Sequence, residues 1–206
     1  NNRIIYFPGA NLLVDRTQID QYWNRLLSCD VFLMQLEIPL ETVAYAAQKL
    51  HEAGKTVILD PAPAVPLPGE LLHHVDYITP NEVELAVLSG LEAGSPDRLA
   101  RAGKKLVQMG ARAVIAKAGT DGAYLFRGDE VIHAPGFRVA AVDTTAAGDS
   151  FNAGFAAGLC RGMAEPDALR FANAVGALST LGLGAQGAMP EYGAVTKFLN
   201  EQKKGK

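Results

Sequence analysis

Hydrophobic and polar positions along the chain fall into two alternating patterns. Short runs rich in β-branched and aromatic residues predict strands, and longer stretches with helical spacing of apolar residues predict amphipathic helices. The predicted strands cover residues 3–7, 30–36, 56–60, 76–80, 112–119, 122–128 and 131–136. The predicted helices cover residues 17–27, 39–54, 81–90 and 96–110, and the chain after Asp143 is nearly all helical. The run at 30–36 predicts a buried strand, and Thr17 is placed to cap the first helix.

Strand–helix alternation of this kind is typical of a mainly parallel sheet that is covered by helices on both faces. No internal repeat or linker interrupts the pattern, so we predict one α/β domain over residues 1–206. Ligands of such folds bind at the carboxyl ends of the strands. The turns to search for a site are therefore those after Gln35, Asp60, Thr79, Lys117 and Val142.

Composition and charge argue against several classes of function. The net charge of −3 gives no reason to expect nucleic acid or an anionic membrane as a partner. No apolar stretch reaches membrane-spanning length, and the first residues lack the layout of a signal peptide. Cys29 and Cys160 lie far apart and outside any Cys/His cluster, which predicts reduced thiols in a cytoplasmic protein.

Two glycine motifs match nucleotide-binding patterns but fail on their context. Residues 182–187, GLGAQG, satisfy G-x-G-x-x-G, yet a helical run precedes them where a dinucleotide fingerprint needs a strand. GKT at 54–56 lacks the upstream glycine of a P-loop and leads into a strand. Neither motif therefore predicts a nucleotide site.

The stretch AVDTTAAGDSFNAGFAAGL, residues 141–159, places a carboxylate where a small-residue turn becomes a helix. The first turn of a helix leaves N–H groups unpaired and carries the positive end of the helix dipole. Alanine and glycine at 146–148 let an anion such as phosphate approach this backbone, with Asp149 beside it as a base for phosphoryl transfer. The alternative is that Asp149 only caps the helix, and the spacing does not separate the two interpretations.

The surrounding motifs resemble those of the ribokinase (PfkB) family of carbohydrate kinases. DTTAAGDSFNAGFAAG is similar to the family's C-terminal signature, NEVE at 81–84 to its N-x-x-E motif, and KAGTDGAY at 117–124 to its K-x-G-x-x-G turn. MQLEIPLETV, LDPAPA and FANAVGALSTLGLGAQGAMP resemble the ribokinases proper in order and spacing. The resemblance runs from about Gly9 to the last helix and implies a ribokinase-like three-layer α/β/α fold.

The resemblance implies a role in phosphoryl transfer for several matched residues. Asp149 would take the proton from the sugar hydroxyl. The anion hole would be formed by the backbone N–H groups of Ala146, Ala147 and Gly148. Asn81 and Glu84 would act near the triphosphate, with Glu84 holding Mg²⁺ through water. The alternative for this pair is a helix cap that Glu84 completes as a capping box, and both roles can hold at once.

The resemblance also implies binding sites for ATP and for the sugar. The phosphates and ribose of the nucleotide would be lined by Lys117, Gly119 and Gly122, with an ordinary hairpin turn as the alternative. Asn173 would lie in the adenine pocket, with an ordinary surface position as the alternative. Glu37, at the end of a hydrophobic strand, would face the sugar, and Asn11 is a weaker candidate for the same region.

Ribokinases also bind a monovalent cation beside the anion hole, largely through main-chain oxygens. The matching positions in this sequence are Asp143, Thr145, Ser179, Gly182, Gly184 and Ala188. Because carbonyl groups would do most of the binding, differences in side chains matter little. We therefore expect K⁺ in addition to Mg²⁺.

One part of the family's pattern has no counterpart in this sequence: an opening strand with a sugar-binding aspartate, a G-G segment, and a β lid that often forms a homodimer interface. We therefore expect the N-terminal strands and the lid to be absent, and the chain to be a fragment or a portion of a longer protein. The resemblance implies ATP-dependent phosphorylation of a sugar hydroxyl, D-ribose to ribose 5-phosphate. The alternatives are another sugar or a nucleoside as acceptor, or an inactive nucleotide-binding fragment.

Overall fold

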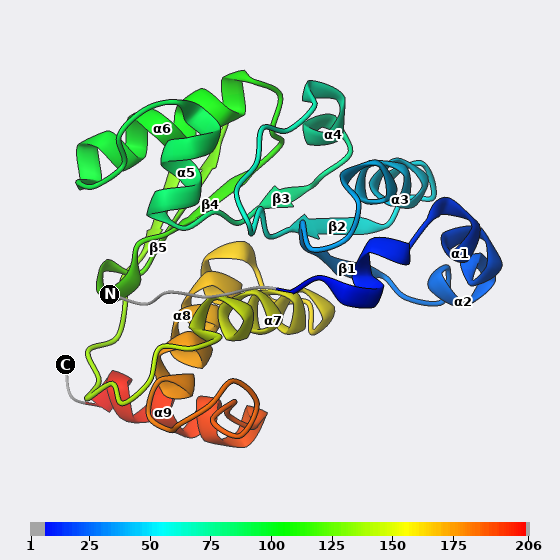
Figure 1. Ribbon diagram of the computed structural model, residues 1–206. Helices are drawn as coiled ribbons and strands as arrows, with labels where there is room; N and C mark the ends of the chain where they lie inside the picture. Colours follow the sequence, from blue (N-terminus) through cyan, green and yellow to red (C-terminus); the bar gives the residue numbers. More distant parts are fainter. Residues whose placement is uncertain (1–6, 205–206) are drawn as a thin grey trace.

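The hydrophobic runs of the sequence form the strands of one sheet in the computed structural model, which describes residues 7–204 (Figure 1). The strands are β1 (Val31–Met34), β2 (Thr56–Leu59), β3 (Tyr77–Ile78), β4 (Val114–Lys117), β5 (Ala123–Arg127) and β6 (Glu130–Ala134). They lie side by side in chain order. β1 to β4 are parallel, whereas β5 and β6 pair antiparallel as successive hairpins.

The amphipathic stretches form the helices, with three short helical segments that the pattern did not predict. The α-helices are α1 (Arg16–Gln21), α2 (Trp23–Leu26), α3 (Leu40–Glu52), α4 (Gly69–His73), α5 (Glu82–Ser89), α6 (Pro96–Gln108), α7 (Ala147–Cys160), α8 (Glu165–Ser179) and α9 (Tyr192–Lys204). The 3₁₀ turns are η1 (Gly9–Leu13) and η2 (Gly119–Asp121). The three segments that the pattern did not predict are α4, η1 and η2. None of these helices combines the length and apolar character needed to cross a membrane.

Helices cover both faces of the sheet, as predicted. Because crossovers between parallel strands are right-handed, strands that follow each other in one direction place their connecting helices on one face. This face carries α3 to α6, and α7 and α8 cover the other (Figure 1). The alternation within β2 decides which core each residue joins: Val57 and Leu59 pack with α3 to α6, while Ile58 packs with α7 and α8. The three-layer α/β/α prediction is confirmed.

Three local predictions need comment. The predicted strand at 3–7 lies outside the described residues except for Phe7, which is exposed in a loop. Thr17 does not cap the first helix: Asp15 does, because its carboxylate accepts the Gln18 N–H at 3.0 Å and the Gln18 side chain completes a capping box. The strand predicted as buried, β1, is at the edge of the described sheet, and Leu33 is 48% exposed.

The carboxyl ends of the parallel strands meet along one edge of the sheet. The ladder continues one residue past β2 and β3, through hydrogen bonds from Asp60 N–H to the Met34 carbonyl of β1 and from Thr79 N–H to the Leu59 carbonyl of β2. Lys117, the last residue of β4, donates its N–H to Pro80 at 2.9 Å. Four of the turns that the sequence marked for a site are therefore neighbours in space.

Candidate active site

The helix α7 begins at the small-residue turn that was predicted to cradle an anion. Ala146 precedes the helix in the left-handed conformation, with φ +58°, which costs a residue with a Cβ about 1 kcal/mol. No side chain caps α7, and the Ala147 N–H makes a long hydrogen bond of 3.2 Å to the Thr144 carbonyl. A helix start without a side-chain cap keeps its N–H dipoles available to a ligand.

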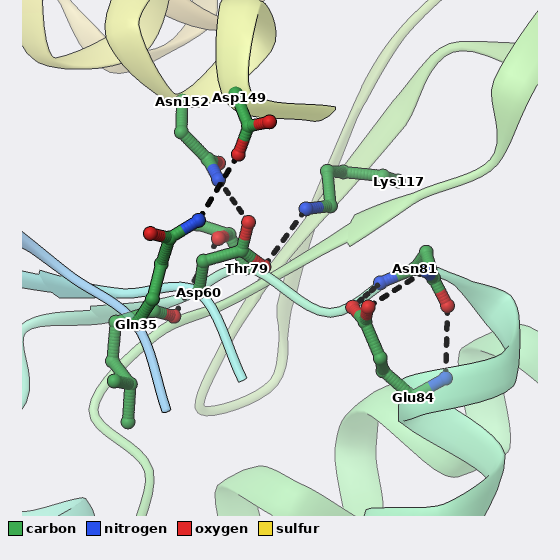
Figure 2. A network of polar contacts seen from close by, with 9 residues as sticks. Gln35, Asp60, Thr79, Asn81, Glu84, Lys117, Asp149 and Asn152 are labelled. Atoms are coloured by element: carbon green, nitrogen blue, oxygen red, sulfur yellow. Dashed lines mark hydrogen bonds and ion pairs between the residues drawn. The ribbon is translucent and has the colours of Figure 1, made fainter. Parts of the chain in front are cut away.

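Asp149 lies in the first turn of α7, and its side chain does not cap the helix. The residue before the helix is Ala146, so the interpretation of Asp149 as the N-cap is wrong. Asp149 is exposed, and its Oδ1 accepts a hydrogen bond of 3.0 Å from the amide of Gln35, directly after β1 (Figure 2). Gln35, at the carboxyl end of β1, therefore orients the Asp149 carboxylate. The second carboxylate oxygen stays available for other contacts.

A buried carboxylate, Asp60, connects this helix to the sheet. Asp60 follows β2 and is 6% exposed. Its Oδ1 accepts from the Lys117 ammonium at 3.0 Å, and its Oδ2 accepts from the Asn152 amide at 2.6 Å (Figure 2). Burial raises the pKa of Asp60, the Lys117 ammonium lowers it, and the nearby Asp149 carboxylate raises it further. Asp60 therefore shares its surroundings with one positive and one negative charge, Lys117 and Asp149.

Asn81 and Glu84 form the capping box that was one of their two expected roles. The Asn81 side chain accepts the Glu84 N–H at 2.8 Å, and Glu84 accepts the Asn81 N–H at 2.7 Å (Figure 2). The Asn81 amide also donates to Glu84 at 2.8 Å. Burial raises the pKa of Glu84; hydrogen bonding to Asn81 and the Lys117 charge lower it, and the Asp60 and Asp149 carboxylates raise it. The cap therefore faces the same group of charges.

A pocket of about 610 Å³ opens beside the start of α7. It collects six of the predicted site residues in one cavity: Lys117, Gly119, Gly122, Ala147, Gly148 and Asn173. Further walls come from the loop after β6, from α7 and from α8, including Phe137, Arg138, Phe151 and Gly176. A cavity of this size accommodates a nucleotide-sized ligand.

The pocket wall at Gly122 needs glycine for a specific reason. Gly122 has φ +94° and ψ −133°, a conformation essentially closed to residues with a Cβ. A Cβ there would lie 2.7 Å from the Pro135 carbonyl carbon and closer still to atoms of Ala134 and Gly136. The η2 turn, which closes the hairpin of β4 and β5, therefore meets the loop after β6 backbone against backbone.

Asn173 is buried, so the alternative of a surface asparagine is wrong. It is 8% exposed, and its amide donates to the Ala134 carbonyl at 2.7 Å and to the Pro135 carbonyl at 3.3 Å. The side chain thus fixes the loop that packs against Gly122, and it lines the pocket at the same time.

Asp143 connects the loop before α7 to the glycine-rich loop before α9. Its Oδ1 accepts from the Thr145 N–H at 2.9 Å and from the Thr145 hydroxyl at 2.7 Å. Its Oδ2 accepts from the Gly184 N–H at 3.0 Å. These hydrogen bonds, those of the Thr145 side chain first, lower the pKa of Asp143 to about 2.

The contribution of Asp143 to stability should disappear in acid. Its pKa is about 2 in the folded chain and 3.8 ordinarily, so the unfolded chain binds more protons between these values. Stability from Asp143 is therefore complete above the ordinary pKa and is lost as pH falls through about 2. Denaturant unfolding of the wild type and Asp143→Asn should show a difference at pH 6 that vanishes toward pH 2. A difference that persists unchanged at pH 2 would contradict this assignment.

The other predicted cation positions lie on the two segments that Asp143 joins. A Cβ built on Gly182 would lie 3.1 Å from the Ala188 Cβ, so the glycine-rich loop folds back on itself. Ser179, at the end of α8, is buried and donates its hydroxyl to the Gly176 carbonyl at 2.8 Å. The Asp143 carboxylate already accepts three hydrogen bonds, so main-chain oxygens would have to supply most ligands of a cation here.

The two predicted sugar contacts lie in the N-terminal part of the described chain. Glu37 is half-buried in the loop between β1 and α3, two residues beyond the Gln35 amide that contacts Asp149. Asn11 is half-buried in η1. Neither residue lines the pocket beside α7. A sugar that contacts Glu37 would thus approach Asp149 from the side of β1.

Sequence reasoning missed three members of the site: Gln35, Asp60 and Asn152. The turns after Gln35 and Asp60 were marked because both follow strands, but no role was assigned to either side chain. An acid that directly follows a hydrophobic strand was a usable signal for Asp60. Asn152 gave no signal, since a polar residue one turn into a small-residue helix is common in any helix.

The comparisons with known proteins place the chain in a family. Residues 1–192 match the model of the pfkB family carbohydrate kinases. The chain therefore belongs to this family. Among curated proteins, the ribokinase of Haemophilus influenzae is 37% identical over 198 residues, which are 96% of this chain and 65% of that protein. The deoxyribokinase of Salmonella typhi is 33% identical, over 97% of this chain and 66% of that protein.

Solved structures give the same result for the fold. A ribokinase from Thermotoga maritima superposes with a TM-score of 0.86 at 40% identity, over 97% of this chain and 66% of its own. A ribokinase from Arabidopsis thaliana, in complex with ribose and ATP, has a TM-score of 0.87 at 33% identity, over 97% and 65%. The chain thus spans about two thirds of the length of these relatives.

Proposed function

We propose that this chain carries the phosphoryl-transfer half of a sugar kinase that moves the γ-phosphate of ATP to the primary hydroxyl of D-ribose. The observation that supports this most directly is the position of Asp149. Its exposed carboxylate lies in the first turn of an uncapped helix, beside a nucleotide-sized pocket. A carboxylate base next to donors that stabilise anionic charge is the arrangement that phosphoryl transfer requires.

In this reaction the residues of the chain have separate tasks. The Asp149 carboxylate accepts the proton of the sugar hydroxyl as its oxygen attacks phosphorus, and Gln35 holds the carboxylate in place. Backbone N–H groups at Ala146, Ala147 and Gly148 face the charge on the transferring phosphate. The pocket that Lys117, Gly119, Gly122 and Asn173 line holds the nucleotide. Glu37 accepts hydrogen bonds from sugar hydroxyls, and Asn11 supports the same region.

Two metal ions complete the proposal. Among the described residues no three His, Cys, Asp or Glu side chains gather to hold a metal by themselves, so Mg²⁺ would take its remaining ligands from phosphates and water. The available donors are carboxylate oxygens, which Mg²⁺ prefers, and Glu84 is the residue proposed to hold it. When bound, Mg²⁺ neutralises charge on the phosphates. K⁺ is proposed between the loop before α7 and the glycine-rich loop before α9, which Asp143 joins, with main-chain oxygens as ligands.

Replacing Glu84 by glutamine separates its two roles. Glutamine can keep the capping-box bond from the Asn81 N–H but has an NH₂ group in place of the oxygen that accepts from the Asn81 amide, so the free energy of unfolding should fall by about 0.5 kcal/mol. The loss of the charge should raise the Mg²⁺ concentration for half-maximal activity by about tenfold. Glu84→Ala is the control, since it also loses the cap and should cost about 1 kcal/mol of stability. An unchanged Mg²⁺ requirement in Glu84→Gln would leave Glu84 with the capping role alone.

The acceptor sugar is the finer part of the proposal. Ribokinases and deoxyribokinases are both among the relatives, so 2-deoxy-D-ribose is the second candidate acceptor. The test is ADP release from ATP with Mg²⁺ and K⁺, for D-ribose, 2-deoxy-D-ribose, a hexose and a nucleoside. We expect turnover to depend on sugar and to be fastest with D-ribose. Faster turnover with another acceptor would reassign the substrate, and turnover with none would leave a nucleotide-binding chain. We place the reaction in the cytoplasm, where the free Cys29 and Cys160 stay reduced.

A further inference from the structure

The buried ion pair between Asp60 and Lys117 has no part in the mechanism so far, although it lies at the centre of the site. Its side chains are 7% and 13% exposed respectively. The pair crosses the sheet: Asp60 follows β2 and Lys117 ends β4, with β3 between the two strands. Burying two charges is expensive, and a well-packed apolar pair is often as stable. Stability alone is therefore a weak reason for this arrangement.

The position of the Lys117 ammonium suggests what the pair is for. A Cβ built on Gly148 would lie 3.4 Å from Lys117 Nζ, so the ammonium is beside the backbone of the first turn of α7. The Lys117 side chain also lines the pocket. A lysine stem has four rotatable bonds, and its ammonium needs a fixed partner to stay in one place. Asp60 is that partner, at 3.0 Å (Figure 2).

The second oxygen of Asp60 acts on the helix itself. It accepts from the Asn152 amide at 2.6 Å, and Asn152 lies one turn after Asp149 on α7. The Asp60 carboxylate therefore fixes the position of the Lys117 ammonium relative to the sheet. It also fixes the position of the start of α7 relative to the sheet. Asparagine at position 60 replaces one of these two oxygens by an NH₂ group, which cannot accept from Lys117 or from Asn152, so one of the two contacts is lost.

We propose that Asp60 is a positioning residue, which holds the Lys117 ammonium beside Gly148 and ties α7 to the sheet through Asn152, so that nucleotide phosphate meets a charge already in place. The inference rests on the proposed function, since it assumes that the pocket binds ATP. Asp60 does not contact the phosphate. Its effect on ATP binding passes through Lys117, and the two residues should therefore be coupled.

A double-mutant cycle on ATP affinity tests this coupling without requiring turnover. The proteins are the wild type, Asp60→Asn, Lys117→Met and the double variant, with the Kd of ATP measured by calorimetry in the presence of Mg²⁺. We expect Lys117→Met to weaken binding by about tenfold or more, because a charge-assisted contact is lost. Asp60→Asn should weaken binding by a similar factor. In the Lys117→Met background, Asp60→Asn should change Kd by less than about twofold.

A matched control separates positioning from stability. Asp76 directly precedes β3, at the amino ends of the strands and therefore at the opposite end of the sheet from the site. Its carboxylate accepts from Arg112 at 2.7 Å and from the Val57 N–H at 2.9 Å. Asp76→Asn should lower the melting temperature and leave the Kd of ATP unchanged. If Asp60→Asn behaves in the same way, with lower stability and normal affinity, Asp60 is structural and the proposal is overturned.

The outcomes of the cycle distinguish failure of the inference from failure of the proposed function. Absence of ATP binding by the wild type would contradict the proposed function, on which the inference depends. Binding by the wild type with additive effects of the two substitutions would overturn the inference alone. If Asp60→Asn does not fold because Lys117 is left unpaired, Lys117→Met can still be compared with the double variant. A Kd of ATP that is a further tenfold higher in the double variant than in Lys117→Met would overturn the proposal.

Discussion

Asp149→Asn should lower kcat for sugar phosphorylation by about 10³-fold, because a positioned general base contributes about 10²- to 10⁴-fold and asparagine cannot accept the proton. The side chain is exposed, and its one described hydrogen bond comes from the Gln35 amide. The substitution preserves side-chain shape, so the melting temperature should not fall measurably. The affinity for ATP should stay within about threefold of the wild type, since the base acts on the acceptor hydroxyl.

The measurements are steady-state kinetics with D-ribose, calorimetry with ATP and thermal unfolding. Asp167→Asn is a matched control: Asp167 is also an exposed aspartate in the first turn of a helix, α8, away from the pocket. It should retain the kcat of the wild type. If Asp149→Asn kept more than a tenth of the wild-type kcat, another group would have to be the base.

Gly122→Ala should lower the free energy of unfolding by about 2–4 kcal/mol and abolish nucleotide binding at working concentrations. Two costs add: the backbone conformation of φ +94° disfavours any Cβ, and the Cβ would collide with the backbone at Ala134, Pro135 and Gly136. Because the neighbours are backbone atoms, relief requires the loop after β6 to move away from η2. That movement would open the pocket wall.

Gly128→Ala distinguishes these two costs. Gly128 also has a positive φ, +54°, but a Cβ there would meet nothing within 4 Å. Its substitution should cost only about 1 kcal/mol and leave ATP binding intact. The measurements are denaturant unfolding and calorimetry with ATP for both variants. Equal losses of stability in the two variants, with ATP binding retained, would show that the close approach of the two loops is unimportant.

Much of the fold could be predicted from local pattern, and the exceptions have local physical causes. Strand–helix alternation predicted the layers because a strand buries every second residue and a helix every third or fourth. The first helix cap was assigned to Thr17, whereas Asp15 caps, since either residue type satisfies the rule and only the backbone path selects one. β1 was predicted as buried from its apolar run. Its exposure depends on its place at the edge of the described sheet, which no window of sequence contains.

Local sequence was enough to identify the family motifs, to predict the helix that carries Asp149 and to pair Asn81 with Glu84. The helix and the cap depend on contacts within about four residues, the range over which helix spacing and caps act. The contacts of Asp60 depend on the folded chain, because its partners Lys117 and Asn152 lie 57 and 92 residues away. The left-handed turn at Ala146 also depends on the folded chain, since an alanine gives no local signal for it. Buried charge is placed by the order of the strands and the docking of α7, and these are properties of the whole chain.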